Sequence, residues 1–241
     1  MEDKDKLNKS LTENTINVFE EVSKLECIKD LYMCGGTAQA LQMQHRKSED
    51  LDFELISTKK NNGSLDLGRI ISEVKSKFPK AKTEILGENH LQMFIGDNVK
   101  LSFFKPQNPV PYINVGYQYN NIKAPNLQDL LGMKVFTTSV RLKYRDYYDI
   151  FSLVLEDYNL SEAVRYACKF SRHEIKSKEF YTNLTTSSLY EPDVNFKLLD
   201  AKHQVDPIQI QEVIKQKIIK EKMQETTQEK PKKNKIKQFK I

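Results

Sequence analysis

The chain has 241 residues, of which 29% are charged and 39% are hydrophobic, and its formal net charge is +5. This length allows one large domain or two small ones, and the composition is typical of a soluble globular protein. No apolar run approaches the roughly 20 residues of a membrane-spanning helix, and the first ten residues lack the apolar segment of a signal peptide. We therefore expect a cytoplasmic protein with no membrane partner.

The cysteines and histidines favour neither a disulfide framework nor a histidine metal site. The three cysteines are an odd number without CxxC spacing, and the four histidines form no HxxxH or HxH pair. We expect reduced, partly buried thiols.

Positive charge is concentrated at the end of the chain. From Lys215 onward there are ten lysines and three glutamates, a net charge of +7, so residues 1–214 carry −2. The last dozen residues are rich in lysine and poor in apolar side chains, which predicts disorder. Such a segment is suited equally to binding RNA through phosphate contacts and to keeping the protein soluble.

The first half of the chain alternates helix and strand patterns. Ser10 and Glu13 have capping-box spacing ahead of an amphipathic stretch that ends near residue 26. "DLYMCGG" indicates a short buried strand stopped by Gly35 and Gly36, and "TAQALQMQ" resumes a helical composition. "DLDFELIS" alternates between apolar and acidic residues, which places Asp50 and Asp52 on the same face of a strand.

Helix and strand patterns continue to alternate as far as Pro125, and beyond it the hydrophobic pattern becomes helical. We expect a helix over 67–78 and then three strands, the last two joined by a turn at 96–98. After Pro125 helical periodicity dominates, and the last helix begins with Asp206 as its cap and Pro207 at its first position. These patterns predict an α+β fold followed by a helical bundle, with an α/β domain over 1–124, helices over 125–225 and a basic tail over 226–241.

The glycine pair and the two aspartates together suggest a nucleotide site. Two carboxylates on one face of a strand repel each other, and a hard divalent cation such as Mg²⁺ relieves that repulsion while also binding phosphate oxygens. A Gly35–Gly36–Thr37 turn that opens a helix offers backbone N–H groups to phosphate. Each feature alone is weak, because a glycine pair is usually a turn and a DxD is usually a solvated face. The chain has neither GxGxxG nor GK[ST], which disfavours Rossmann and Walker A sites.

The string "GGTAQALQMQHRKSEDLDFEL" resembles the first motif of the nucleotidyltransferase superfamily. More narrowly, GGTA, then HR, then S, then DLDF resembles the AbiEii/AbiGii-type nucleotidyltransferases of bacterial abortive-infection and toxin–antitoxin systems. "MKVFTTSVRLKYRDYYDIFSL" resembles the downstream segment of that family, a lysine followed by Arg-Asp-x-x-Asp. The resemblance covers roughly residues 28–155 and implies a mixed α/β nucleotidyltransferase core followed by helices.

The resemblance also implies roles for individual residues. Asp50 and Asp52 match the metal-binding aspartates, and Gly35, Gly36 and Thr37 match the turn on the phosphate side. Further matches are Lys134 for the nucleotide phosphates, Asp146 or Asp149 for the later acidic position, Arg46 for a phosphate contact and Ser48 for a structural hydrogen bond.

One position departs from the superfamily pattern. Many members carry a third carboxylate on a following strand, where this chain has Ser102. In two-metal phosphoryl transfer that carboxylate helps to activate the attacking hydroxyl. Either Asp52 or the later aspartate takes its place, or the enzyme is weakened or inactive, and we favour the active interpretation.

An ordinary structural interpretation of the second segment remains open. Arg145 and Asp149 have the i,i+4 spacing of a helix-surface ion pair. The aromatic residues of this segment are better explained as bundle core than as a base-stacking platform; they are Phe136, Tyr144, Tyr147, Tyr148 and Phe151.

We therefore expect a Mg²⁺-dependent nucleotidyltransferase that moves a nucleoside monophosphate from an NTP to a hydroxyl acceptor. The resemblance implies an RNA end, notably tRNA, or a protein hydroxyl as the acceptor, and an antitoxin as a partner. The alternatives are a nucleotide-binding module without catalysis and an RNA-binding protein with an incidental DxD.

Overall fold

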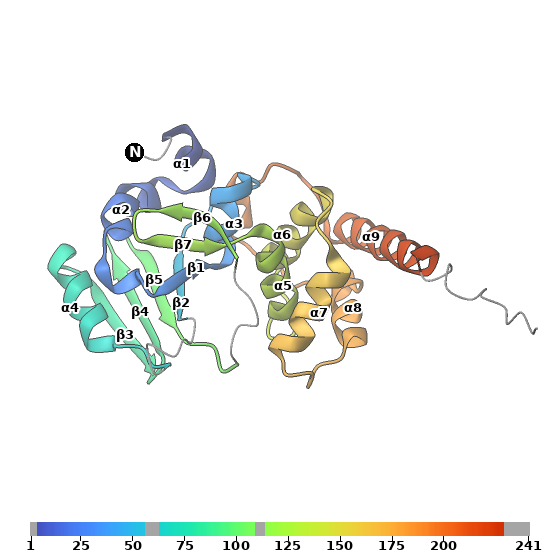
Figure 1. Ribbon diagram of the computed structural model, residues 1–241. Coiled ribbons are helices and arrows are strands. Elements are labelled where there is room, and N and C mark those ends of the chain that lie inside the picture. The colour runs from blue at the N-terminus through green and yellow to red at the C-terminus, as the bar shows by residue number, and fades with distance from the viewer. Residues whose placement is uncertain (1–3, 56–62, 109–113, 229–241) are drawn as a thin grey trace, which may run out of the picture.

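The computed structural model describes residues 4–55, 63–108 and 114–228, with a mixed α/β part beside a helical part (Figure 1). Its elements in chain order are α1 (Lys4–Ser10), α2 (Glu13–Ser23), η1 (Glu26–Ile28), β1 (Leu31–Cys34), α3 (Gly35–Met43), β2 (Leu51–Leu55), α4 (Leu67–Lys77), β3 (Lys82–Gly87), β4 (His90–Ile95), β5 (Val99–Phe104), β6 (Val115–Tyr119), β7 (Ile122–Pro125), α5 (Leu127–Thr137), α6 (Tyr144–Leu155), α7 (Leu160–Phe170), α8 (Ser177–Leu184), η2 (Ser187–Leu189), η3 (Phe196–Leu199) and α9 (Pro207–Gln228). This order confirms the predicted fold class.

A five-stranded mixed sheet lies at the centre of the first part. Its strand order is β1-β2-β5-β4-β3, with β2 and β5 parallel and the other neighbouring pairs antiparallel. The predicted hairpin between β4 and β5 is confirmed. The register places Asp52 opposite Cys34 of β1 on one side and opposite Ser102 of β5 on the other.

The two faces of this sheet differ in polarity because the strands alternate. The apolar face packs against α2 and α4 in one hydrophobic cluster that includes Phe19, Val22, Phe53, Val74 and Phe103. Alternation puts Asp52, Glu54, Lys100 and Ser102 on the opposite, polar face. The sheet therefore presents its charged residues away from the core.

The helical part has its own cluster, built around α6. Tyr147 and Tyr148 are fully buried in it, Phe151 is nearly so, and Phe136 and Tyr144 pack against its edge, which confirms that the aromatic residues form bundle core. The last helix, α9, begins at Pro207, and Asp206 accepts a hydrogen bond from the backbone N–H of Gln209, as predicted.

Three features differ from the sequence predictions. The prediction of a capping box at Ser10 and Glu13 is wrong, because Ser10 ends α1. The N-cap of α2 is Thr12, and its side chain makes no capping hydrogen bond. Helix α1 and the β6–β7 hairpin were not predicted. Helix α9 also continues to Gln228, three residues into the predicted basic tail of 226–241, while residues 229–241 lie outside the described part of the chain.

The domain boundaries at 124 and 225 stay a prediction, although the two hydrophobic clusters divide within α5, between Leu130 and Leu131. None of the helices described here combines the length and the apolar character needed to cross a bilayer.

Candidate active site

The turn after β1 brings two glycines against two charged side chains. Gly35 opens α3 with a φ of +71°, a conformation that glycine adopts without steric cost. A Cβ on Gly35 would lie 3.2 Å from Oδ2 of Asp52, and a Cβ on Gly36 would lie 2.3 Å from Nη2 of Arg46. Larger residues at either position would therefore push on a charged side chain.

The N-terminus of α3 lies at this turn. Its N-cap residue, Cys34, makes no side-chain capping hydrogen bond within the described structure. The first N–H groups of a helix have no partner inside the helix, and they give this end a partial positive charge. The turn can therefore bind phosphate oxygens next to Asp52.

Thr37 and Ser48 fix the backbone at Asp50. Both side chains are buried, and their hydroxyls are hydrogen-bonded to each other at 2.8 Å. The Thr37 hydroxyl also contacts the backbone carbonyl of Asp50 as a hydrogen-bond donor. These two residues therefore position the strand that carries the aspartates.

The segment between α3 and β2 is held from both ends of the chain. Ser48 forms an isolated β-bridge with Leu11. The segment makes two backbone hydrogen bonds with residues 10–12: Ser48 N–H to the Ser10 carbonyl (2.9 Å) and Thr12 N–H to the Ser48 carbonyl (3.1 Å). It makes two more with residues 199–202: Lys47 N–H to the Leu199 carbonyl (2.6 Å) and Lys202 N–H to the His45 carbonyl (2.9 Å). The approach to the aspartates thus depends on residues near both termini.

Asp50 and Asp52 lie side by side at the start of β2, facing Lys100 of β5. Nζ of Lys100 is 2.7 Å from Oδ2 of Asp50, and both side chains are about one-third exposed. Burial raises the pKa of Asp52, and the charge of Lys100 and a hydrogen bond from Ser102 offset that rise only in part. The pair is therefore a site where a cation would relieve unfavourable burial and repulsion.

The two aspartates fit a divalent cation that arrives with a nucleotide. Mg²⁺ is commonly bound by one or two carboxylates together with phosphate oxygens and water. Among the described residues, no three His, Cys, Asp or Glu side chains gather into a metal site. Phosphate oxygens would have to complete the coordination.

Lys134 and the two later aspartates form a buried ionic network between α5 and α6. Lys134 is 5% exposed, and its Nζ lies 2.8 Å from Oδ1 of Asp146 and 2.7 Å from Oδ2 of Asp149. From the outer side, Nε of Arg141 lies 2.8 Å from Oδ2 of Asp146. Burial alone would raise the pKa of Asp146, but the charges of Lys134 and Arg141 outweigh it and lower that pKa.

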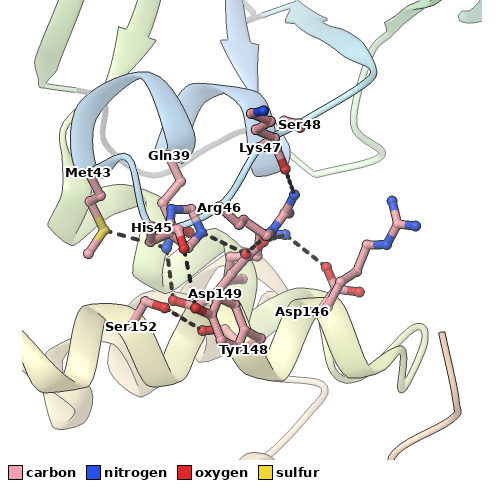
Figure 2. Close-up of polar contacts among 12 residues, drawn as sticks. Gln39, Met43, His45, Arg46, Lys47, Ser48, Asp146, Tyr148, Asp149 and Ser152 are labelled. Carbon is pink, nitrogen blue, oxygen red and sulfur yellow. Dashed lines mark hydrogen bonds and ion pairs between the residues drawn. The ribbon is translucent and has the colours of Figure 1, made fainter. Parts of the chain in front are cut away.

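Figure 2 shows how Arg46 and His45 reach Asp149 from the segment after α3. Nε and Nη2 of Arg46 donate to the two carboxylate oxygens at 2.7 and 2.9 Å, and Nε2 of His45 lies 2.8 Å from Oδ1. Burial would raise the pKa of Asp149, yet the charges of Arg46 and Lys134 hold it well below the usual range. Burial also lowers the pKa of His45.

Arg145 does not pair with Asp149, so the proposed i,i+4 pair is wrong. Its guanidinium instead contacts the carboxylate of Asp193, with 3.1 Å between Nη2 and Oδ1, and lies 3.3 Å from Glu49, the residue before the first aspartate. Arg145 therefore ties the approach to β2 to the segment after α8.

The sequence-predicted residues thus fall into two groups. Gly35, Gly36, Asp50 and Asp52 gather at the edge of the polar face. The others are buried behind it: Thr37, Arg46, Ser48, Lys134, Asp146 and Asp149. Direct phosphate contacts by Arg46 and Lys134 stay predictions, because carboxylates already bind both cations.

Sequence reasoning missed the two cations nearest the aspartates. Lys100 could have been found from the alternation in "VKLSFF", which puts it on the same face as Ser102. Arg141 lies between α5 and α6, where no periodic pattern marks it. Burial lowers its pKa, while the charges of Asp146 and Asp52 raise it, which places the guanidinium within electrostatic reach of both carboxylates.

The chain has a mixed sheet, a glycine turn and two aspartates at one edge of the sheet, and helices that follow them. This combination is that of the nucleotidyltransferase class of folds. The sequence profile described as "Nucleotidyl transferase AbiEii toxin, Type IV TA system" matches residues 19–231. The chain therefore belongs to the AbiEii nucleotidyltransferase toxin family, as its motifs suggested.

Solved structures support the same fold. JHP933 from Helicobacter pylori is 17% identical with a TM-score of 0.52, and the match covers 91% of this chain and 98% of that one. MenT4, a nucleotidyltransferase toxin from Mycobacterium tuberculosis H37Rv, is 12% identical with a TM-score of 0.55, covering 85% of this chain and 82% of that one. At these identities the likeness shows the fold alone.

A curated relative is the uncharacterised protein aq_aa25 of Aquifex aeolicus (strain VF5). It is 28% identical over 139 residues, which cover 56% of this chain and 63% of the relative. The match thus spans less than two thirds of the length of that relative.

Proposed function

We propose that the protein transfers a nucleoside monophosphate from an NTP to a hydroxyl acceptor and releases pyrophosphate. The observation that carries this proposal is the approach of the glycine turn to Asp52, where a Cβ on Gly35 would lie 3.2 Å from the carboxylate. A phosphate site and a cation site therefore adjoin each other at the edge of the polar face. Membership of a nucleotidyltransferase toxin family supports the same reaction.

Asp50 and Asp52 would hold Mg²⁺ in this reaction. When bound, Mg²⁺ supplies Lewis-acid chemistry that polarises the α-phosphate and lowers the pKa of the acceptor hydroxyl. The N–H groups at the start of α3 bind phosphate oxygens, and Arg141 adds positive charge beside the triphosphate.

The acceptor oxygen forms a bond to the α-phosphorus while the bond from that phosphorus to the bridging oxygen breaks, and pyrophosphate leaves. We assign the acceptor proton to Asp52, whose pKa is raised by burial. Asp146 and Asp149 are fully buried, and their neighbouring cations lower their pKa values, so they are poor bases.

We assign positioning roles to the buried group. Asp146 bridges Lys134 and Arg141, so Lys134 acts on the site through the placement of Arg141. Arg46 and Asp149 fix the segment that leads into β2, and Thr37 and Ser48 fix the backbone of Asp50.

The acceptor class we propose is an RNA end, with tRNA first and a protein hydroxyl second. The basic segment after Lys215 supports RNA through its phosphate-binding capacity. The family description supports a toxin of a type IV toxin–antitoxin system. We propose that it acts in the cytoplasm and is opposed by an antitoxin.

A second candidate function is nucleotide binding without transfer. Ser102 favours it, because a serine stands opposite Asp52 where many superfamily members have a third carboxylate. Such a protein would bind NTP with Mg²⁺ and release no pyrophosphate.

The test is incubation of the purified protein with each α-³²P-labelled NTP, Mg²⁺ and total bacterial RNA, followed by denaturing gels. We expect label on RNA, or on the protein itself, and none with Asp50→Asn/Asp52→Asn protein. Lys82→Met, an exposed lysine of β3, is the control and should leave labelling unchanged. Labelling by the double variant would overturn the site, and Mg²⁺-dependent NTP binding without any label would favour the binding module.

A further inference from the structure

Lys100 stands closer to the catalytic aspartates than its place in the sequence suggests. It lies on β5, two residues before Ser102 and therefore on the same face of the sheet. Its Nζ contacts Oδ2 of Asp50 at 2.7 Å. Its charge also interacts electrostatically with the carboxylate of Asp52. One ammonium therefore acts on both carboxylates.

The number of carboxylates available to a metal is small. Ser102 is opposite Asp52 in the register, where it supplies a hydroxyl instead of a carboxylate. Glu54 is the next acidic residue on this face of β2, but it is only 3% exposed and is therefore closed to an ion that arrives with a nucleotide. Within the described residues, Asp50 and Asp52 are thus the two carboxylates left for metal ions at this edge.

Two-metal phosphoryl transfer needs more negative charge from the protein than this site supplies. Two divalent ions about 3.5–4 Å apart repel each other, and bridging carboxylates offset that repulsion. A third carboxylate and a second divalent ion would together add one positive charge to the site. Lys100 adds the same single charge without either of them.

We propose that Lys100 replaces the second divalent ion, so that the transferase works with one Mg²⁺ that arrives with the NTP. This inference rests on the proposed function. The ammonium holds Asp50 while no nucleotide is bound. When an NTP binds, the ammonium donates hydrogen bonds to phosphate oxygens and stabilises the charge that develops in the transition state.

The first test counts metal ions instead of measuring turnover. Mn²⁺ is titrated into the full chain mixed one to one with each α,β-methylene nucleotide, and free Mn²⁺ is followed by electron paramagnetic resonance. We expect one Mn²⁺ per complex for the unchanged protein and two for Lys100→Met/Ser102→Asp protein, where the carboxylate is restored. Two ions on the unchanged protein would overturn the inference and leave the proposed function standing. No bound ion with any nucleotide would contradict both proposals.

The second test measures Mn²⁺ binding and transfer with the ammonium removed. A metal ion that binds Asp50 must break its ion pair with Lys100, and a partly exposed pair of this kind contributes up to about 1 kcal/mol. In the absence of nucleotide, Lys100→Met should therefore tighten Mn²⁺ binding about two- to fivefold. It should also slow transfer by about 10²-fold. Lys82→Met should change neither quantity. An unchanged transfer rate in folded Lys100→Met protein would overturn the inference.

Discussion

Arg46 and Asp149, 103 residues apart in the sequence, meet through two hydrogen bonds of 2.7 and 2.9 Å in a site closed to solvent. They join the segment that leads into β2 to helix α6. Nζ of Lys134 lies 2.7 Å from Oδ2 of the same Asp149 carboxylate. The strand that carries Asp52 and the helical part are therefore coupled through buried charge.

Replacing Asp149 with Asn should cost about 3–5 kcal/mol in the free energy of unfolding. The change leaves Arg46 and Lys134 buried without a shared negative partner. Urea denaturation measures the loss. Glu191→Gln is a matched control, because Glu191 forms an exposed pair with Lys143, and it should cost less than about 1 kcal/mol. Similar losses for the two variants would show that the buried network contributes little to stability.

Gly35→Ala should lower both stability and transfer. The residue has a φ of +71°, which costs an L-residue about 1–2 kcal/mol, and its Cβ would lie 3.2 Å from Oδ2 of Asp52. Gly87→Ala is the control, because a Cβ there meets nothing within 4 Å. Thermal melts and labelling assays compare the two variants. A Gly35→Ala protein as active as Gly87→Ala would argue against phosphate binding at this turn.

Asp52→Asn should abolish transfer and leave the melting temperature unchanged or slightly higher. Burial raises the pKa of Asp52, so the folded state disfavours the charged carboxylate. An uncharged side chain of the same shape removes that penalty. Calorimetry and labelling on the same preparation check both parts. A large drop in melting temperature would indicate a structural role for Asp52 instead.

Stability should fall as the pH rises toward 8 because of Glu54. Burial raises its pKa from 4.5 to about 8. Between these two values the folded state holds a proton that the unfolded state has lost. The stabilisation is complete below the unfolded pKa and is lost as the pH rises through about 8.

Glu54→Gln should flatten this pH dependence when chemical denaturation is compared at pH 5, 7 and 9. The titratable side chains that its charge influences are Cys34 and Tyr166. Neither carries charge over most of this range, so the difference in slope between the two proteins belongs mainly to Glu54. A variant that keeps the original slope would refute the assignment.

Glu221→Gln should loosen the attachment of α9 to α7. The Glu221 carboxylate accepts hydrogen bonds from the backbone N–H groups of Leu160 (2.8 Å) and Ser161 (2.7 Å), at the positive end of α7. Charged hydrogen bonds of this kind contribute about 1.5–3 kcal/mol. Glu225→Gln, an exposed residue of the same helix, should have little effect in the same thermal melts. Equal losses of melting temperature in the two variants would mean that the buried isoleucines of α9 alone attach this helix.

Strands β4 and β5 could be predicted because each one alternates. Their apolar side chains stand at every second position and face one core, whereas the edge strand β3 exposes its adjacent Ile85 and Leu86. The β6–β7 hairpin lacks this signal, since β6 has a single buried residue and a β-bulge shifts its register between Val115 and Tyr117. Helix α1 is short and contributes mainly Leu7 to the core.

The place of the candidate site was predictable from motifs, whereas the pairing of its charges was not. The glycine turn and Asp50 and Asp52 are local in sequence, so spacing alone placed them together. The partners of Asp149 come from α5 and from the segment after α3. Helical spacing favoured Arg145 as its partner, but Arg145 reaches Asp193 instead. Such choices depend on tertiary packing, which local spacing does not report.

The backbone hydrogen bond between Lys47 and Leu199 means that the approach to the two aspartates is completed only late in synthesis. The two residues are 152 positions apart. At an elongation rate of about 5–20 residues per second, the ribosome needs roughly 8–30 s to add that length. Throughout this interval the nascent chain already carries both aspartates but lacks the segment that holds their approach in place. Until Leu199 has been added, the approach to the aspartates therefore lacks one of the backbone hydrogen bonds that hold it in place.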